Sequence, residues 1–137
     1  PLSLYRNITK ANSKMKNGEW DQDGLGPIYP LDEAVLGLVG LGNIGRAVAR
    51  KMSGWRMKTL AYDPYLPPWT MKEYGIEQVA DLNKLFARSD YVSVQVPLNS
   101  ETRHMIGAEQ FDQMKPLDPE QLASAASSAG VPDEPIR

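Results

Sequence analysis

The sequence predicts an α/β fold built on a doubly wound parallel sheet. Three short apolar runs, at residues 35–39, 58–62 and 91–96, have the composition of buried strands. They alternate with segments in which apolar residues recur at helical spacing, and glycine or proline residues separate the segments. Because parallel strands are joined by crossovers that are usually helices, this alternation predicts helices on both faces of the sheet.

Residues 1–34 predict a linker helix and a connector. Residues 3–16 place three apolar side chains among polar ones, a weakly amphipathic pattern typical of a surface helix, and Asn17 with Gly18 ends it. Residues 21–30 hold too many helix and strand breakers for regular structure, namely Gly24, Gly26, Pro27 and Pro30. We expect this part of the chain to lead into the sheet without belonging to it.

A strand, a helix and a second strand follow as one βαβ unit. Residues 35–39 are apolar apart from one glycine, which predicts a strand buried on both faces and central in its sheet. Residues 43–52 predict an amphipathic helix whose inward face carries Ile44, Ala47, Val48 and Met52. The next strand, over residues 58–62, ends before Pro64, because proline lacks the N–H group that a strand ladder needs.

The alternation continues after a proline-rich loop that begins at Pro64. Residues 76–79 predict a short edge strand, and Asp81 predicts the N-cap of a helix whose inward side chains are Leu82, Leu85 and Phe86. Residues 91–96 predict the fourth strand, which Pro97 ends, and residues 108–114 predict a last helix. Residues 35–116 therefore predict one domain.

The remaining residues, 117–137, change in character. They hold an Ala- and Ser-rich run at residues 123–128 with prolines around it, which predicts a low-complexity tail with one helix at most. The sequence also starts without an initiator Met, which is typical of a fragment.

Composition excludes several classes of function. Fifteen basic against 17 acidic residues leave a net charge of −2, without the basic excess of a nucleic-acid-binding protein. The absence of cysteine excludes a disulfide framework and a thiolate metal site, and it fits a reducing compartment, so we expect a cytoplasmic location. No apolar run approaches the roughly 20 residues that span a bilayer, which predicts no membrane partner.

The turn between the first strand and the first helix carries the strongest functional signal. Gly40, Gly42 and Gly45 have the spacing of a dinucleotide-binding turn of the Rossmann type. The first glycine permits the tight turn, the second lets the backbone approach a pyrophosphate, and the third lets helix and strand pack closely. At the helix N-terminus, the backbone N–H groups of Asn43 and Ile44 are expected to donate to phosphate oxygens.

Asp63 supplies the second half of this signal. It ends the second strand, at about the spacing expected of the acid that binds an adenosine ribose. Its carboxylate would accept hydrogen bonds from both ribose hydroxyls and repel a 2′-phosphate, which favours NAD over NADP. Three glycines alone would indicate only a turn, and Asp63 alone only a turn-forming residue before Pro64. The glycines follow the first predicted strand and Asp63 follows the second at the expected spacing, and this combination favours nucleotide binding.

The other polar and aromatic residues carry weaker signals. His104 lies in a polar stretch without an evident acid partner, so we interpret it as a surface histidine. The three tryptophans are interpreted as packing residues, and Asp32 and Glu33 as solvated charges. No metal-ligand spacing is present, and no residue is assigned a catalytic role.

Together these motifs resemble the D-isomer-specific 2-hydroxyacid dehydrogenases, a family that includes phosphoglycerate dehydrogenase and hydroxypyruvate reductases. The resemblance runs from about Trp20 to Pro116, and its most specific segments are LVGLGNIGR at 38–46, AYDPY at 61–65, SDYVSVQVPL at 89–98, ETR at 101–103 and MKP at 114–116. It implies that Val96 and Pro97 line the adenosine side of the cofactor cleft and that Thr102 lies near it. Gln95 stands where the family usually has His.

The sequence departs from the family after Pro116. There the family continues with another strand and the Arg that binds the substrate carboxylate, followed by the Glu and His that exchange a proton as hydride moves to or from NAD. Leu117 to Leu122 resemble sequence that normally follows the Arg, which indicates an internal deletion or an altered reading of the gene. With the doubly wound strand order 3-2-1-4, the sheet is expected to be C-terminally incomplete, with the fourth strand as an uncovered edge.

The leading hypothesis is therefore the NAD-binding domain of an oxidoreductase that transfers hydride between NAD and a D-2-hydroxy acid or 2-keto acid. Its partners would be this small substrate in the complete enzyme and, as the resemblance implies, a second copy in a homodimer. The alternatives are a non-catalytic, NAD-dependent binding module like a corepressor and an inactive truncated remnant.

Overall fold

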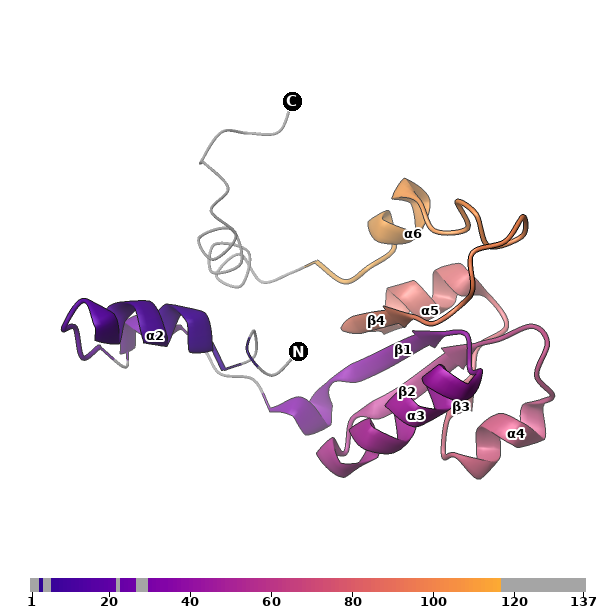
Figure 1. Ribbon diagram of the computed structural model, residues 1–137, viewed down its shortest axis with the longest axis horizontal. Coiled ribbons are helices and arrows are strands. Elements are labelled where there is room, and N and C mark those ends of the chain that lie inside the picture. The colour runs from indigo at the N-terminus through magenta and orange to yellow at the C-terminus, as the bar shows by residue number, and fades with distance from the viewer. Residues whose placement is uncertain (1–2, 4–5, 22, 27–29, 117–137) are drawn as a thin grey trace. The chain divides into compact units, whose positions relative to one another are not determined.

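The computed structural model describes residues 3, 6–21, 23–26 and 30–116. The sheet belongs to one compact unit, Leu31–Lys115, and the residues before it belong to another. Figure 1 shows the helices and strands of both units. The predicted low-complexity tail at 117–137 and part of the predicted connector lie outside the described residues.

The N-terminal unit contains the predicted surface helix, α2 (Ile8–Lys16), in which no residue is buried. It ends at Asn17 and Gly18 as predicted, and Gly18 takes a left-handed φ of 78°. The prediction of an irregular connector is wrong for three residues, because η1 (Asp23–Leu25) is a short 3₁₀ helix. The Asp21 side chain accepts a hydrogen bond from the Gly24 N–H at 2.8 Å, and this bond closes the turn.

The sheet has four parallel strands: β1 (Val35–Val39), β2 (Lys58–Tyr62), β3 (Glu77–Gln78) and β4 (Tyr91–Val94). Their order is β3-β2-β1-β4, which confirms the predicted order and the central place of β1. The third strand is shorter than the predicted residues 76–79. Ile76 and Val79 are buried beside it, whereas Glu77 and Gln78 are exposed.

β4 is also shorter than the predicted residues 91–96. The Gln95 N–H still donates to the Val39 carbonyl at 2.7 Å, but the chain then leaves the sheet toward Pro97. Within the described residues, β4 pairs with β1 only, so it forms an edge of the sheet. Its last residue, Val94, is 48% exposed.

The helices cover both faces of the sheet, as predicted. α3 (Asn43–Met52) connects β1 to β2, and α5 (Leu82–Arg88) leads back to β4 on the other side of β1. Because parallel crossovers are right-handed, connections running in opposite directions place their helices on opposite faces, as Figure 1 shows. The Asp81 side chain accepts from the Asn83 and Lys84 N–H groups, which confirms the predicted N-cap.

The inward face of α3 differs from the prediction. Gly45 and Ala49 are its buried residues, whereas Ile44 is 66% exposed. The reason is that α3 approaches the preceding turn closely through Gly45, which has no side chain. Because α3 turns its Gly45 side toward the turn, the side chain of the neighbouring residue Ile44 faces solvent.

One helix lies in the proline-rich stretch that the sequence predicts as a loop. α4 (Pro68–Glu73) starts with proline in its first turn, where the missing N–H has no acceptor within a helix and costs nothing. Thr70 and Met71 of this helix are buried, and their burial stabilises the segment. The loop prediction is therefore wrong from residue 68 to residue 73.

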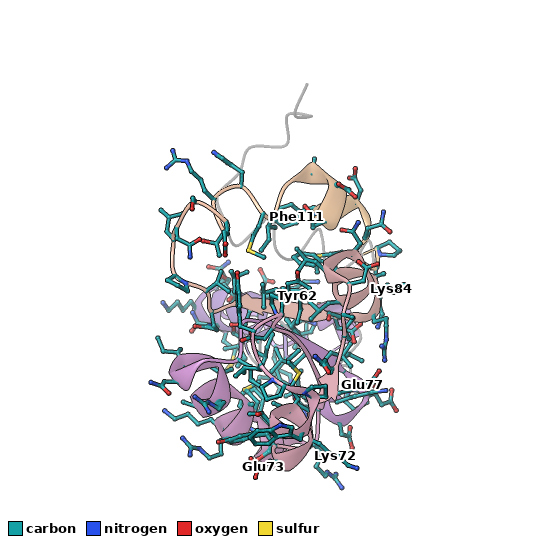
Figure 2. The ribbon with its side chains drawn as sticks, turned by 90° about the vertical axis from the view of Figure 1, so that its right-hand side faces the viewer. Tyr62, Lys72, Glu73, Glu77, Lys84 and Phe111 are labelled. Atoms are coloured by element: carbon teal, nitrogen blue, oxygen red, sulfur yellow. The ribbon has the colours of Figure 1, made fainter. Side chains whose placement is uncertain are left out.

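One cluster of the core lies between the sheet and α5. Leu85 and Phe86 are fully buried against β1 and β2, and Leu82 is half-buried, as their predicted inward orientation requires. α6 (Ala108–Asp112) is shorter than predicted, and its Phe111 is labelled in Figure 2. The Phe111 ring contacts the Phe86 ring edge to face, with the ring centroids 6.3 Å apart. In the described part of the chain, no helix is long and apolar enough to cross a membrane.

Candidate functional site

The turn after β1 begins at Gly40, which takes a left-handed φ of 90°. Its N–H donates to the Tyr62 carbonyl at 2.9 Å, so the turn starts from the end of the sheet. A Cβ at Gly40 would lie 2.7 Å from Val96 Cγ1 and 2.9 Å from the Gln95 carbonyl oxygen. The conformation and the crowding both require glycine, and Val96 lies against the turn.

Gly45 and Gly42 differ in what surrounds them. A Cβ at Gly45 would lie 2.3 Å from the Gly40 carbonyl oxygen, because α3 rests directly on the turn. A Cβ at Gly42 would meet nothing within 4 Å, and the residue is exposed. Gly40 and Gly45 therefore hold the turn together, whereas Gly42 leaves a space that a bound group can fill.

α3 begins at Asn43, directly beside this space. The first N–H groups of a helix have no acceptor within the helix, and they carry the positive end of the helix dipole. Arg46 donates to Asn43 Oδ1 at 3.1 Å and thereby adds a guanidinium near the turn. The local charge suits an anion such as a pyrophosphate.

Asp63 lies at the same turn, as its spacing predicts. Its Oδ2 accepts from the Leu41 N–H at 2.9 Å, and its Oδ1 accepts from the Tyr65 N–H at 3.0 Å. Each carboxylate oxygen has a second lone pair, so the half-buried group can still accept hydrogen bonds from ligand hydroxyls. The structure therefore brings the acid and the glycine turn together through a direct hydrogen bond.

The loop after β4 carries the remaining predicted residues. Thr102 Oγ1 donates to the Pro97 carbonyl at 2.5 Å, which fixes the two ends of the loop. Asn99 Oδ1 accepts from the N–H groups of Glu101 and Thr102, both at 2.9 Å. Thr102 thus holds Pro97 in place, and Val96 connects this loop to Gly40.

A side-chain contact that sequence reasoning missed joins two of these loops. The Tyr65 hydroxyl donates to the Glu101 carboxylate. The hydrogen bond to Glu101 is the main cause that raises the pKa of the Tyr65 hydroxyl, and the nearby negative charges add to the effect. No periodicity or motif links residues 36 positions apart, so the sequence offers no signal for this pair.

The weaker candidates stay outside this site. His104 is exposed, as predicted, and so are Asp32 and Glu33, with Asp32 paired to Arg56 at 3.3 Å. The prediction that the tryptophans serve packing is wrong for Trp20 and Trp69, which are 76% and 66% exposed. Among the described residues, no group of three or more His, Asp or Glu side chains is placed to hold a metal ion.

Comparison with known families gives one match that spans most of the chain. The family model described as "D-isomer specific 2-hydroxyacid dehydrogenase, NAD binding domain" matches residues 1–118. D-3-phosphoglycerate dehydrogenase of Methanocaldococcus jannaschii is 40% identical over 114 residues, which cover 83% of this chain and 22% of that protein. Glyoxylate reductase of Thermococcus litoralis is 38% identical over 121 residues, which cover 84% of this chain and 36% of the reductase.

Solved structures agree with this match. D-lactate dehydrogenase from Aquifex aeolicus, in complex with NAD and lactic acid, has a TM-score of 0.75 and 32% identity over 83% of this chain and 34% of its own. The apo D-lactate dehydrogenase from Escherichia coli has a TM-score of 0.71 and 36% identity over 83% of this chain and 36% of its own. The chain thus spans between about a fifth and about a third of the length of these proteins.

Proposed function

Because the chain belongs to the family of D-isomer-specific 2-hydroxyacid dehydrogenases, and matches the part described as their NAD-binding domain, we propose that it binds NAD at the glycine turn. Members of this family are NAD-dependent dehydrogenases of D-2-hydroxy acids. The residues that would hold the cofactor are Gly40, Gly42, Asn43, Ile44, Gly45, Asp63, Val96, Pro97 and Thr102.

One observation carries this proposal. The open space at Gly42 lies in a turn whose other two glycines are tightly packed, and Asp63 is hydrogen-bonded to the same turn. A pyrophosphate at Gly42 would meet the N-terminus of α3, and a ribose beside Asp63 would find a carboxylate with free lone pairs. The residues present therefore fit a dinucleotide, and the acid favours NAD over NADP.

The reaction proposed for the whole enzyme is hydride transfer between NAD and a D-2-hydroxy acid or its 2-keto acid. Bound NAD supplies a nicotinamide ring that accepts or returns the hydride. The described residues would bind and orient the adenosine diphosphate half, and among them we assign no catalytic residue. We therefore expect little or no turnover from the 137-residue chain alone, whereas measurable dehydrogenase activity of the purified chain would contradict this expectation.

The first test is a titration of the purified chain with NADH, followed by energy transfer from its tryptophans to the nicotinamide. We expect saturable binding that is weaker for NADPH. Asp63→Ala should weaken NADH binding about 10- to 100-fold, because hydrogen bonds to a charged group contribute roughly 1.5–3 kcal/mol. An exposed acid elsewhere in the same unit, Glu73, provides the control, and Glu73→Ala should bind NADH normally. No saturable binding of either nucleotide would contradict the proposal.

Three further expectations accompany this function. The similar proteins reported above are named as enzymes, which favours a dehydrogenase over a non-catalytic binding module or an inactive remnant. A cytoplasmic location is proposed because the absence of cysteine fits a reducing compartment. A homodimer is proposed from the family resemblance, and sedimentation velocity of the purified chain would test it.

A further inference from the structure

The hydrogen bond between Tyr65 and Glu101 joins the loop after β2 to the loop after β4. In the sheet, β2 and β4 lie on either side of β1, and the glycine turn follows the carboxyl end of β1. The bond therefore links the loops that follow the two strands beside β1. These strands lie about two strand spacings apart, roughly 10 Å. In open α/β sheets, ligands bind in the crevice outside the carboxyl ends of the strands, so this bond lies across the adenosine end of the proposed cofactor site.

Both partners are fixed by backbone hydrogen bonds to the loops that hold them. The Tyr65 N–H donates to Asp63 Oδ1 at 3.0 Å, and the Glu101 N–H donates to Asn99 Oδ1 at 2.9 Å. Glu101 is therefore not a free surface acid, even though it is exposed. Tyr65 connects the Glu101 carboxylate to Asp63, because its hydroxyl binds Glu101 and its backbone N–H binds Asp63.

The environment of the Tyr65 hydroxyl agrees with this placement. The Glu101 hydrogen bond and charge, and more weakly the charge of Asp63, raise the pKa of the Tyr65 hydroxyl. The Tyr65 hydroxyl thus lies near both carboxylates. Salt screens charges over about 8 Å at physiological ionic strength, so over roughly 10 Å we expect the Glu101 charge to act on a group bound beside Asp63 only in weakened form.

We propose that Glu101, held by Tyr65 across the adenosine end of the cleft, is a second cofactor-selecting residue whose carboxylate disfavours the 2′-phosphate of NADP. This inference rests on the proposed NAD site and adds a determinant that the spacing of the glycines and Asp63 does not contain. Tyr65 is a positioning residue in it, because its hydroxyl donates the hydrogen bond that holds the Glu101 carboxylate to the loop after β2.

The test is a calorimetric titration of the 137-residue chain with NADH and NADPH at about 0.15 M salt. Glu101→Gln should strengthen NADPH binding relative to NADH about two- to fourfold, which is the size expected of one screened charge near 10 Å, and NADH binding should change less than about twofold. Tyr65→Phe should shift the ratio in the same direction by less, and the double variant should shift it no further than Glu101→Gln. At about 1 M salt the shift should vanish, since screening then acts over about 3 Å.

Glu73→Gln is the matched control, because it removes the same charge from an exposed site on α4. Figure 2 shows Glu73 well separated from Tyr62, the last residue of β2. Glu73→Gln should leave the ratio of the NADH and NADPH affinities unchanged. An equal shift in Glu73→Gln would assign the effect to net charge and overturn the proposal.

The other outcomes separate this inference from the proposed function. NADH binding with an unchanged ratio in Glu101→Gln, or with an equal loss of both nucleotides, overturns the inference and leaves the NAD site standing. A shift in the double variant that equals the sum of both single shifts shows independent action and overturns the positioning role of Tyr65. No NADH binding by the unaltered chain contradicts the NAD site and this inference together.

Discussion

At the scale of single residues, the three glycines of the turn differ in what a Cβ would cost. At Gly45 a Cβ would lie 2.3 Å from the Gly40 carbonyl oxygen, a backbone atom that moves only with the turn itself. At Gly42 the space is open and φ is −68°, a value that any residue adopts. Spacing alone assigns these residues to one motif, but the structure separates their contributions to stability and to binding.

We expect Gly45→Ala to destabilise the fold by about 1–3 kcal/mol, because the added methyl group forces the helix and the turn apart. Gly42→Ala should leave the free energy of unfolding unchanged or raise it slightly, yet weaken NADH binding, since its methyl group occupies the space left for the cofactor. Urea unfolding and NADH titration of both variants measure the two quantities. Loss of stability in Gly42→Ala, or normal stability in Gly45→Ala, would contradict this division of roles.

The local pattern predicts the backbone part of the site but not its side-chain contacts. Gly40, Gly45 and Asp63 could be placed from the sequence, because their spacing reflects a fixed strand, turn and helix geometry. The contact between Tyr65 and Glu101 could not, because it depends on where two loops meet after folding.

At the scale of elements, the edge strand β3 shows how charge supports a two-residue strand. Glu77 pairs with Lys58 at 2.9 Å, on the neighbouring strand, and with Arg88 at 2.6 Å, at the end of α5. The hydrogen bonds from Lys58 and then from Arg88 lower the pKa of the Glu77 carboxyl below its ordinary value of 4.5. Charged side chains on an edge strand also hinder its pairing with another chain.

This pKa shift gives stability a defined pH dependence. Since the folded-state pKa of Glu77 lies below 4.5, its contribution is complete above that pH and is lost as the pH falls through the lower folded-state value. We therefore expect Glu77→Gln to lower the unfolding midpoint slightly at pH 7 and to reduce the loss of stability between neutral and acidic pH. Glu73→Gln removes an exposed acid of the same unit and should keep the pH profile. If Glu77→Gln loses as much stability between neutral and acidic pH as the unaltered chain, Glu77 is not the source of this pH dependence.

The N-cap of α5 offers a second test at this scale. Asp81→Ala removes the acceptor of two N–H groups and should cost about 1 kcal/mol of unfolding free energy. Asp81→Asn keeps a capping side chain and should retain most of that stability. Urea unfolding at neutral pH measures the free energy of unfolding of the unaltered chain and of both variants. Equal losses in both variants would show that the charge of Asp81, not its capping geometry, stabilises α5.

Elements with a strong local signal could be predicted, and elements set by the surroundings could not. The N-cap at Asp81 and the apolar strand β1 each carry their information in a few consecutive residues. α4 was missed because three prolines between residues 64 and 68 suggest a loop, whereas the burial of Met71 stabilises a helix there. The end of β4 was misplaced because its apolar composition continues after the ladder has ended.

At the scale of the whole molecule, β4 presents an edge within the described residues, and Val94 at its end is 48% exposed. An apolar edge strand is a template for pairing with another chain. We expect the purified chain to associate as its concentration rises, and Val94→Lys to reduce this association, because a charge on the edge disfavours pairing. Sedimentation velocity over a range of concentrations measures it. Association that Val94→Lys does not change would place the contact on another surface.

The central position of β1 also sets an order of events during folding. Among the four strands of the described sheet, β1 is synthesised first, and β2 completes one of its sides within a single βαβ unit. Its other side waits for β4, whose preceding residue Asp90 binds the Val35 N–H across 55 residues of chain. Contacts that distant form late, because a long loop must close first. We therefore expect a nascent chain to hold the strand beneath the glycine turn half-paired until Tyr91 to Val94 have left the ribosome, and the turn to gain its contact with Val96 only after that.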